Sequence, residues 1–439
     1  MKLISLRAEL GHGRQGLLVP ASDRGRKRRC PTGRAAVLLA SAATALVGTA
    51  CSAATSGPRS AGHGPPPVAA PTSGRASAGD GPPPITVLAQ RAGSGNGDIF
   101  IAPQGGGAYA DGPEILTSSG KVVWSHAVPV GETATDFRAQ TYQGRPVLTW
   151  FQGSGLSGTD YIYNDRYRQI AHVRAANGDL TDFHEFLITP WNTALILADT
   201  FGTANLSSIG GPANQKVFDG IVQEIDIATG KVLFQWDSAD HVPYRDSHKP
   251  LPASVASPWD WFHINAVHLD TDGNLLINSR FTWTTYKVNL RTGNIIWELG
   301  GKQSTFKLAA APGQELDSAG EIFAFQHDPE AIGNGEYTFF DDESDGPTTL
   351  LAHSRVVTVK LDLATRVATL VKSVDQPEGL VASAEGNAQT TRNGDLFVGW
   401  GALPYISEFS PAGHLLFNAE LPAGVSTYRA YLLPWHPAS

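Results

Sequence analysis

A short turn motif recurs six times along the chain and constrains the fold more than any other feature. In a clear copy, Asp226 begins the turn, Gly230 ends it, and β-branched and aromatic residues follow up to Phe234. Such a turn is typical of a β-hairpin, because the Asp side chain caps it and Gly supplies a positive φ. The position of this Gly recurs at residues 120, 167, 230, 293, 366 and 413.

The spacing of these turns predicts the architecture. Successive copies lie 47 to 73 residues apart, a length typical of a meander of short strands with loop insertions. Six copies therefore predict an all-β, six-bladed β-propeller with a central channel. Residues 98–102 and 428–434 are expected to pair where the ring closes. A β-sandwich or several small β domains are the alternatives, but sandwiches do not repeat one hairpin chemistry six times.

The first 50 residues have the layout of an export signal. A basic stretch at 24–34 precedes an uncharged apolar run at 35–47, which is too short to span a bilayer. The segment 47–51 is similar to a lipoprotein signal, which would place a lipid on Cys51. We therefore expect an extracytoplasmic protein that is anchored to the cell membrane at Cys51, or one that is simply secreted; an uncleaved signal anchor is a third possibility.

Composition divides the remainder of the chain. Residues 51–83 are rich in Ser, Gly and Pro and are expected to form a disordered tether, whereas residues 84–439 are expected to form the propeller. Of the 33 basic and 41 acidic residues, residues 1–34 hold nine and two, which leaves 24 and 39 and a net charge of −15. So acidic a domain disfavours nucleic acid as a partner.

Three histidines occupy the same place in the repeat. His184 lies in D-F-H-E-F, His263 in W-F-H-I-N and His327 in F-Q-H-D-P, each ahead of an apolar strand. Equivalent positions of neighbouring blades face the same channel, so the three imidazoles are expected to converge there. Imidazole is a nucleophile that is neutral near pH 7, which suits group transfer.

Several strings of the chain, in the same order, resemble those of the arylsulfotransferase family of bacterial and fungal secreted propellers, most closely its actinobacterial and fungal branch. They run from Asp182 to Pro190, Trp261 to Val267, Asn278 to Arg280, Ile296 to Lys302, Phe325 to Pro329 and Tyr428 to Tyr431. The resemblance implies transfer of sulfate from a phenolic sulfate ester to another phenol without the nucleotide donor PAPS, through a sulfated histidine.

The resemblance also implies roles for single residues. His327 matches the sulfated histidine, and Arg280 matches an arginine that would hold the sulfate oxygens in a fork. His263 and His184 match the other channel histidines and would exchange protons with the phenols. Asn265 matches an asparagine that can donate to the sulfate, and Asn387 is a weaker candidate for substrate binding. No cofactor and no metal are expected; the partners are a small phenolic sulfate, a phenol and, through the lipid anchor, the membrane.

Other residues near these motifs are expected to have structural roles. His268 follows His263 at an odd spacing and is expected to face the other side in a structural role. Glu185 alternates away from His184. The acidic stretch 341–346 departs from the Asp-Asn-Gly turn frequent in the family, and a solvated turn is expected there, because the spacing does not fit an EF-hand. Three convergent histidines could hold zinc or copper, although they lack the spacing of H-E-x-x-H.

Two other functions compete with sulfate transfer. The chain could be a surface-tethered propeller that binds a ligand without turnover. A quinone-dependent dehydrogenase is less favoured, because Trp124 and Trp297 recur at the hairpin phase and not in the channel. The long insertions 201–220, 237–259 and 301–324 are expected to cover one mouth of the channel.

Overall fold

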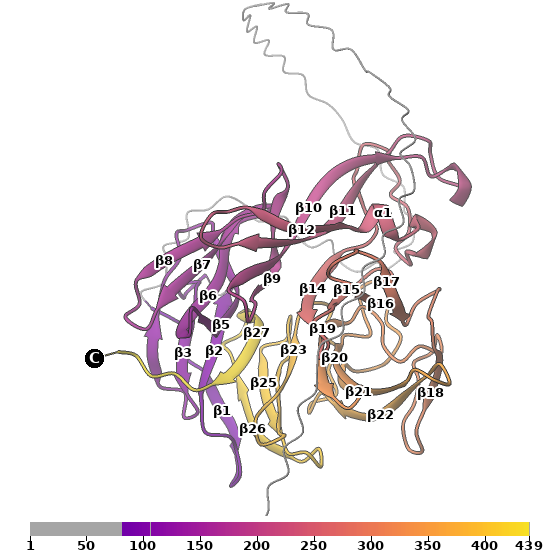
Figure 1. Cartoon of the computed structure of the whole chain (residues 1–439). Helices are drawn as coiled ribbons and strands as arrows, with labels where there is room; N and C mark the ends of the chain where they lie inside the picture. The colour runs from indigo at the N-terminus through magenta and orange to yellow at the C-terminus, as the bar shows by residue number, and fades with distance from the viewer. Residues whose placement is uncertain (1–80, 106, 439) are drawn as a thin grey trace, which may run out of the picture. The chain divides into compact units, whose positions relative to one another are not determined.

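A computed structural model describes residues 81–105 and 107–438; the predicted export signal, Cys51 and most of the predicted tether lie outside them. Six mainly antiparallel sheets follow one another along the chain (Figure 1). The innermost strands of neighbouring sheets contact one another in a closed ring. The described part of the chain is therefore an all-β, six-bladed propeller, as the turn spacing predicts.

The first three blades contain four main strands each. From the axis outward, blade 1 is β27 (Ser426–Leu433), β2 (Asp98–Gln104), β3 (Glu114–Thr117) and β4 (Val122–Ser125). Blade 2 is β5 (Thr133–Tyr142), β6 (Arg145–Ser154), β7 (Ser157–Asn164) and β8 (Gln169–Val173). Blade 3 is β9 (Leu180–Ile188), β10 (Thr193–Ala204), β11 (Gln215–Asp226) and β12 (Val232–Asp237), with β13 (Trp259–Asp260) beside β11.

The other three blades follow the same plan. Blade 4 is β14 (Ile264–Leu269), β15 (Leu275–Ser279), β16 (Thr284–Val288) and β17 (Ile295–Leu299). Blade 5 is β19 (His327–Gly333), β20 (Glu336–Asp341), β21 (Arg355–Asp362) and β22 (Val367–Asp375), with β18 (Lys307–Ala310) outside β22. Blade 6 is β23 (Asn387–Thr390), β24 (Leu396–Gly399), β25 (Tyr405–Phe409) and β26 (Leu415–Glu420), with β1 (Thr86–Gln90) outside β26.

Both ends of the described chain close the ring. The last strand, β27, is the innermost strand of blade 1 and pairs with β2, so that Asp98 lies opposite Leu433 (Figure 1). The predicted pairing of these two segments is confirmed. At the other end, β1 pairs with β26 and adds an outer strand to blade 6.

The recurrent turn joins the third and fourth strands of every blade. Its six key positions all have positive φ, including Tyr167 at 57° and Arg366 at 56°, where Gly is replaced. Residues other than Gly rarely adopt this backbone conformation, so the hairpin geometry overrides the backbone preference of Tyr167 and Arg366.

The hydrophobic core lies between the blades. Six clusters of buried residues each combine side chains from two neighbouring blades; Leu195 and Val222 of blade 3, for example, pack with Val267 and Ile277 of blade 4. Because each blade buries both of its faces, the inner strands are held rigidly around the axis and can position side chains there.

The three long insertions differ in structure. In the first, β10 and β11 stay paired as far as Ala204 and Gln215, beyond their neighbours β9 and β12, and η1 (Ser207–Ile209) follows. The second contains α1 (Ser238–His241) and η2 (Tyr244–Asp246). In the third, β18 lies at the outer edge of blade 5, so the expectation that this insertion covers a channel mouth is wrong for this strand. No helix within the described residues is long and apolar enough to cross a membrane.

Candidate active site

The inner strands share an irregularity at one level of the channel. In five of the six, one or more residues bulge out of the pairing with the second strand. The bulged residues are Tyr428 and Arg429 in β27, Asp136 and Phe137 in β5, Asp182 to Glu185 in β9, Asn265 in β14, and Asp328 and Pro329 in β19. Bulges re-aim side chains and are frequent beside functional sites. Here they bring successive residues of one strand toward the axis.

His184 lies in the bulge of β9 and is held by its own strand. Its Nδ1 is 2.7 Å from Asp182 Oδ1, which also accepts a hydrogen bond from the His184 backbone N–H. The ring of Phe183 stacks on the imidazole with centroids 4.0 Å apart. Burial lowers the pKa of His184, against the opposing effect of Asp182, so the imidazole is neutral near pH 7.

His263 lies immediately before β14, with a strained φ of 51°. Its Nδ1 is 2.5 Å from Asp260 Oδ2, and its ring centroid is 5.1 Å from that of His184. Its backbone carbonyl accepts a hydrogen bond from the N–H of Arg280 at 3.0 Å. His184 and His263 therefore lie close together, as the repeat predicts. The hydrogen bond from the Arg280 N–H to the His263 carbonyl connects His263 to Arg280.

His327 is the first residue of β19 and is almost completely buried. Its Nδ1 is 2.7 Å from Oδ2 of Asp342, which is also buried. Burial lowers the pKa of His327 well below its usual range, and the nearby charge of Arg280 lowers it further. Burial raises the pKa of Asp342, whereas Arg280 favours its carboxylate. When Asp342 is ionised, a neutral imidazole with its proton on Nδ1 donates to its carboxylate and leaves Nε2 free to react.

Arg280 follows β15 and is fixed by backbone oxygens, not by a carboxylate. Its Nη2 donates to the carbonyl of Ser344 at 3.3 Å and to that of Ser383. The rings of Phe281 and Phe325 flank the guanidinium at 5.3 and 5.7 Å. Its Nε is buried and has no hydrogen-bond partner among the described residues. One edge of the guanidinium is thus anchored while Nε remains available to an anion.

The two asparagines predicted to bind substrate hold neighbouring strands together. Asn387 donates to the carbonyl of Ala430 at 2.8 Å and accepts from its N–H at 2.9 Å. Asn265 donates to the carbonyl of Gln326 at 2.9 Å and accepts from Asn278 at 2.6 Å. Contact of either side chain with a substrate stays a prediction.

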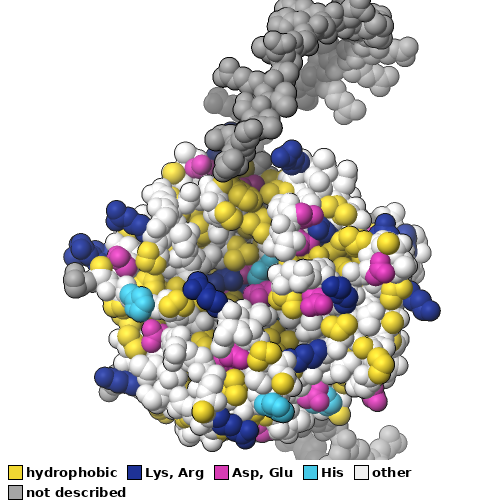
Figure 2. Space-filling model, turned by 60° about the horizontal axis from the view of Figure 1, so that its bottom comes forward, with side chains coloured by type: hydrophobic (Ala, Val, Ile, Leu, Met, Phe, Trp, Pro, Cys, Tyr) yellow, Lys and Arg dark blue, Asp and Glu magenta, His cyan; other side chains and the backbone are white. Residues whose placement is uncertain are grey.

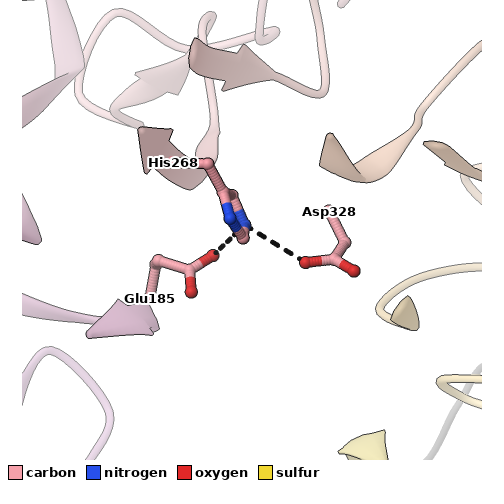
Figure 3. Close-up of side chains that lie close together, drawn as sticks. All are labelled: Glu185, His268 and Asp328. Carbon is pink, nitrogen blue, oxygen red and sulfur yellow. Dashed lines mark ion pairs between the residues drawn. The ribbon is translucent and has the colours of Figure 1, made fainter. Parts of the chain in front are cut away.

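Six charged side chains form what we call the central ion network: Asp136, Arg138, Glu185, His268, Asp328 and Arg429. Arg429 Nη1 lies 2.8 Å from Glu185 Oε2 and 3.2 Å from Asp136 Oδ1, and Arg138 pairs with the same two carboxylates. The His268 ring lies between Glu185 and Asp328, with Nε2 3.2 Å from each (Figure 3). The backbone N–H of Ala388, in blade 6, donates to Asp328. All six blades therefore meet in this network.

The sequence predicts a structural role for His268 but not the location of His268 and Glu185 in this network. Both were expected to face away from the site histidines, by strict alternation along a strand. The bulges at Asn265 and at 182–185 interrupt that alternation, and both side chains lie at the axis. A weak signal was present, because Glu185 and Asp328 each directly follow a predicted site histidine.

Glu185, His268 and Asp328 are also close enough together to hold a metal ion. Their charges favour another role. Burial alone would lower the pKa of His268, but Glu185 and Asp328 outweigh it and raise the pKa to about 10, so the ring is protonated and has no lone pair for a metal. Arg429 also occupies the same oxygens. The group is best described as part of a balanced set of ion pairs.

The expectation of a solvated acidic turn at 341–346 is wrong. Asp341, Asp342 and Glu343 are buried. Arg355 lies 2.9 Å from Asp341 and 3.0 Å from Glu343, whereas Asp342 is bonded to His327. The extra carboxylates of this chain therefore support an arginine and a site histidine.

A hollow on one face of the protein supports a channel that opens to solvent. Figure 2 shows one face of the described part, hollowed near its middle, where a histidine, basic and acidic side chains are visible. Charged side chains of both signs are scattered over the rest of this face.

A family model described as "Arylsulfotransferase (ASST)" matches residues 138–421. No curated protein matches the chain. Among solved structures, a Bacteroides caccae protein of unknown function is 13% identical, with a TM-score of 0.46, over 76% of this chain and 99% of that one. Periplasmic gluconolactonase from Pseudomonas aeruginosa is 12% identical, with a TM-score of 0.39, over 77% and 100%. Neither similarity is high enough to carry an argument.

Proposed function

The chain belongs to the arylsulfotransferase family, and from that premise we propose that it transfers a sulfuryl group from a phenolic sulfate ester to a phenol through a sulfated His327. The observation that carries this proposal is the carboxylate on Nδ1 of each channel histidine: Asp182 on His184, Asp260 on His263 and Asp342 on His327. A carboxylate at Nδ1 selects the tautomer whose Nε2 is a nucleophile or a base.

The reaction has two balanced steps. In the first, His327 Nε2 attacks the sulfur of the aryl sulfate, the N–S bond forms, and the S–O bond to the aryl group breaks to release a phenolate. In the second, the oxygen of a phenol attacks the same sulfur, the phenol gives its proton to a base of the channel, and the N–S bond breaks to restore the imidazole. The Nδ1 proton of His327 stays on the ring and is hydrogen-bonded to Asp342. The carboxylate of Asp342 stabilises the positive charge of the sulfated ring.

Arg280 would stabilise the sulfuryl group in both steps. The three outer oxygens of the group carry negative charge in the transition state, as in phosphoryl transfer. Arg280 is held by Ser344 and Ser383 and has a free Nε, so it can donate to these oxygens without reorganising. His184 and His263 would contact the phenolic oxygen through Nε2, which can accept a proton from it.

The location of this activity follows from the N-terminal sequence. The basic stretch, the apolar run and Cys51 support export and anchoring to the membrane by a lipid on Cys51, or secretion. The order of the quoted motifs supports membership of the actinobacterial and fungal branch. A tethered domain outside the cytoplasm would meet phenols and their sulfates without a nucleotide donor.

Trapping of the intermediate tests the proposal. The purified protein is mixed with 4-nitrophenyl sulfate without an acceptor, quenched and measured by intact mass and peptide mapping. We expect a gain of one sulfuryl group, about 80 Da, on the peptide that contains His327, and its loss when a phenol is added. His327→Ala should give no adduct, whereas His414→Ala, at an exposed hairpin, should behave as wild type. Binding of the ester without an adduct would instead favour the non-catalytic binding module.

A further inference from the structure

The charge of Arg280 acts on a second carboxyl group, that of Glu385, which the proposed reaction does not use. Glu385 is located in the loop between β22 and β23, two residues before Asn387. Its φ is 71°, a conformation that non-glycine residues rarely adopt. Strain of this kind persists only where the surroundings fix it, and it is concentrated at functional sites.

Contacts fix this loop on three sides. On one side, the carbonyl of Ser383 accepts a hydrogen bond from Arg280. On another, the N–H of Gly386 donates to the carbonyl of Tyr428 at 3.0 Å, and the ring of Tyr428 lies 5.6 Å from that of His184. On the third, Gly401 packs so closely that a Cβ there would lie 2.6 Å from the carbonyl carbon of Glu385. The loop therefore connects the sulfate-binding arginine to the histidine side of the channel.

The carboxyl group of Glu385 is incompletely satisfied. Its Oε2 is buried and has no hydrogen-bond partner among the described residues. A buried polar atom without a partner costs free energy, and such atoms in native sites indicate a ligand or a reacting group. The residue as a whole is half-buried.

The charged groups around Glu385 come from three different elements. Arg280 follows β15, Asp342 follows β20 and Tyr428 belongs to β27. Burial raises the pKa of Glu385 to about 7, although Arg280 opposes this shift. In turn, Glu385 contributes to the raised pKa values of Asp342 and Tyr428. The carboxyl group can thus gain and lose a proton near neutral pH, which is optimal for acid–base catalysis.

The proposed reaction needs such a group. A phenolate that leaves the sulfur must be protonated, and the phenol that attacks next must lose its proton. His184 is a poor proton donor, because burial keeps its imidazole neutral and its one proton is held by Asp182.

We propose that Glu385 is a further acid–base catalyst of the sulfuryl transfer, an inference that rests on the proposed function. In the first step its carboxylic acid donates its proton to the departing phenolate oxygen as the S–O bond breaks. In the second, its carboxylate accepts the proton of the attacking phenol as the new S–O bond forms. The proton and the carboxyl group are restored after each cycle.

A series of donors tests the role, because an acid matters only for a poor leaving group. In Glu385→Gln, burst formation of the His327 adduct from phenyl sulfate should slow by about 100-fold. With 4-nitrophenyl sulfate, whose phenolate leaves without a proton, it should slow by less than about threefold. Glu298→Gln is the matched control: Glu298 lies on the outermost strand of blade 4 and burial also raises its pKa to about 7. It should leave both rates unchanged.

Two results would overturn the inference. An equal fold-loss with both donors would mean that Glu385 only positions Arg280, and two rates equal to those of the wild type would mean that it has no role. A pH profile gives a second readout: the limb near pH 7 in the phenyl sulfate reaction should disappear in Glu385→Gln, and its persistence would count against the proposal. Absence of an adduct in the wild-type protein with either donor would refute the proposed function itself, which distinguishes the two failures.

Discussion

His268 and His327 are buried imidazoles of one channel, and their surroundings shift their pKa values in opposite directions. His268 lies between two carboxylates of the central ion network, which raise its pKa to about 10 despite burial. His327 has one carboxylate, Asp342, and the positive charge of Arg280 lies nearby, so burial dominates and its pKa falls. The same side chain is a cation at neutral pH in one place and a neutral imidazole in the other.

The balance of charge explains the difference. With His268 protonated, the central ion network contains three cations and three carboxylates, each in contact with an opposite charge. In the candidate active site, Arg280 instead forms no ion pair with a carboxylate among the described residues and is held by the carbonyls of Ser344 and Ser383. Buried charges that are paired with one another support the fold, whereas a buried cation without a carboxylate partner can bind an anionic substrate.

The largest expected effect comes from removing a cation from the central ion network. Arg429→Met should leave Glu185 and Asp136 without one of their partners and lower the free energy of unfolding by about 3–5 kcal/mol, as for other broken buried ion pairs. Urea denaturation measures this change. Arg291→Met, at an exposed turn, should stay within about 0.5 kcal/mol of wild type. A loss below about 1 kcal/mol in Arg429→Met would show that the network does not support the fold.

The matching change in the candidate active site should affect activity and not stability. Arg280→Lys keeps a positive charge but cannot donate to two carbonyls and to the sulfate together. We expect kcat/KM for 4-nitrophenyl sulfate to fall by about 100-fold, or about 2.7 kcal/mol. The free energy of unfolding should stay close to that of wild type. Activity within about threefold of wild type would mean that Arg280 does not hold the sulfate.

The sequence contains enough information to predict the six blades, because each hairpin turn is local. An Asp or Asn followed by Gly fixes a turn through contacts within a few residues, and even Tyr167 and Arg366 were recognised from their neighbours. The closure of the ring by β2 and β27 followed from the apolar strands at the two ends.

The sequence does not show which channel residues belong to the central ion network and which to the candidate active site. Alternation along a strand assumes regular pairing, and the bulges of β9, β14 and β19 break that assumption at the residues that matter. The role of Asp342 was missed for a related reason. A run of acidic residues resembles a solvated turn until a buried arginine, Arg355, and a buried histidine, His327, are found beside it.

The charge of His268 should make the free energy of unfolding depend on pH. Its folded pKa, about 10, exceeds the ordinary value of 6.5, so the protonated ring stabilises the fold fully below pH 6.5, and this contribution is lost as pH rises through 10. At pH 7, His268→Gln should therefore be less stable than wild type by about 2 kcal/mol, and the gap should shrink at pH 10–11. Urea denaturation at both pH values checks this. A gap that does not change with pH would mean that His268 is neutral.

The smallest effect is expected at the carboxylate behind His327. Asp342→Asn keeps the size of the side chain, but its amide can accept from Nδ1 or donate to it, so the reactive tautomer is no longer selected. We expect adduct formation from 4-nitrophenyl sulfate to slow by about tenfold, or about 1.4 kcal/mol. The pH profile gives an independent readout. Burial raises the pKa of Asp342, and only its carboxylate accepts the Nδ1 proton, so wild-type activity should rise as Asp342 ionises.

That rise should vanish in Asp342→Asn, whereas Asp345→Asn, in the same loop but paired with Lys249, should keep both the rate and the profile. An unchanged rate, or a rise with pH that survives in Asp342→Asn, would show that Asp342 only fills space. Both rings are buried. If the rise vanishes while stability is kept, the difference between the pKa values of His268 and His327 comes from the number and charge of their neighbours and not from burial.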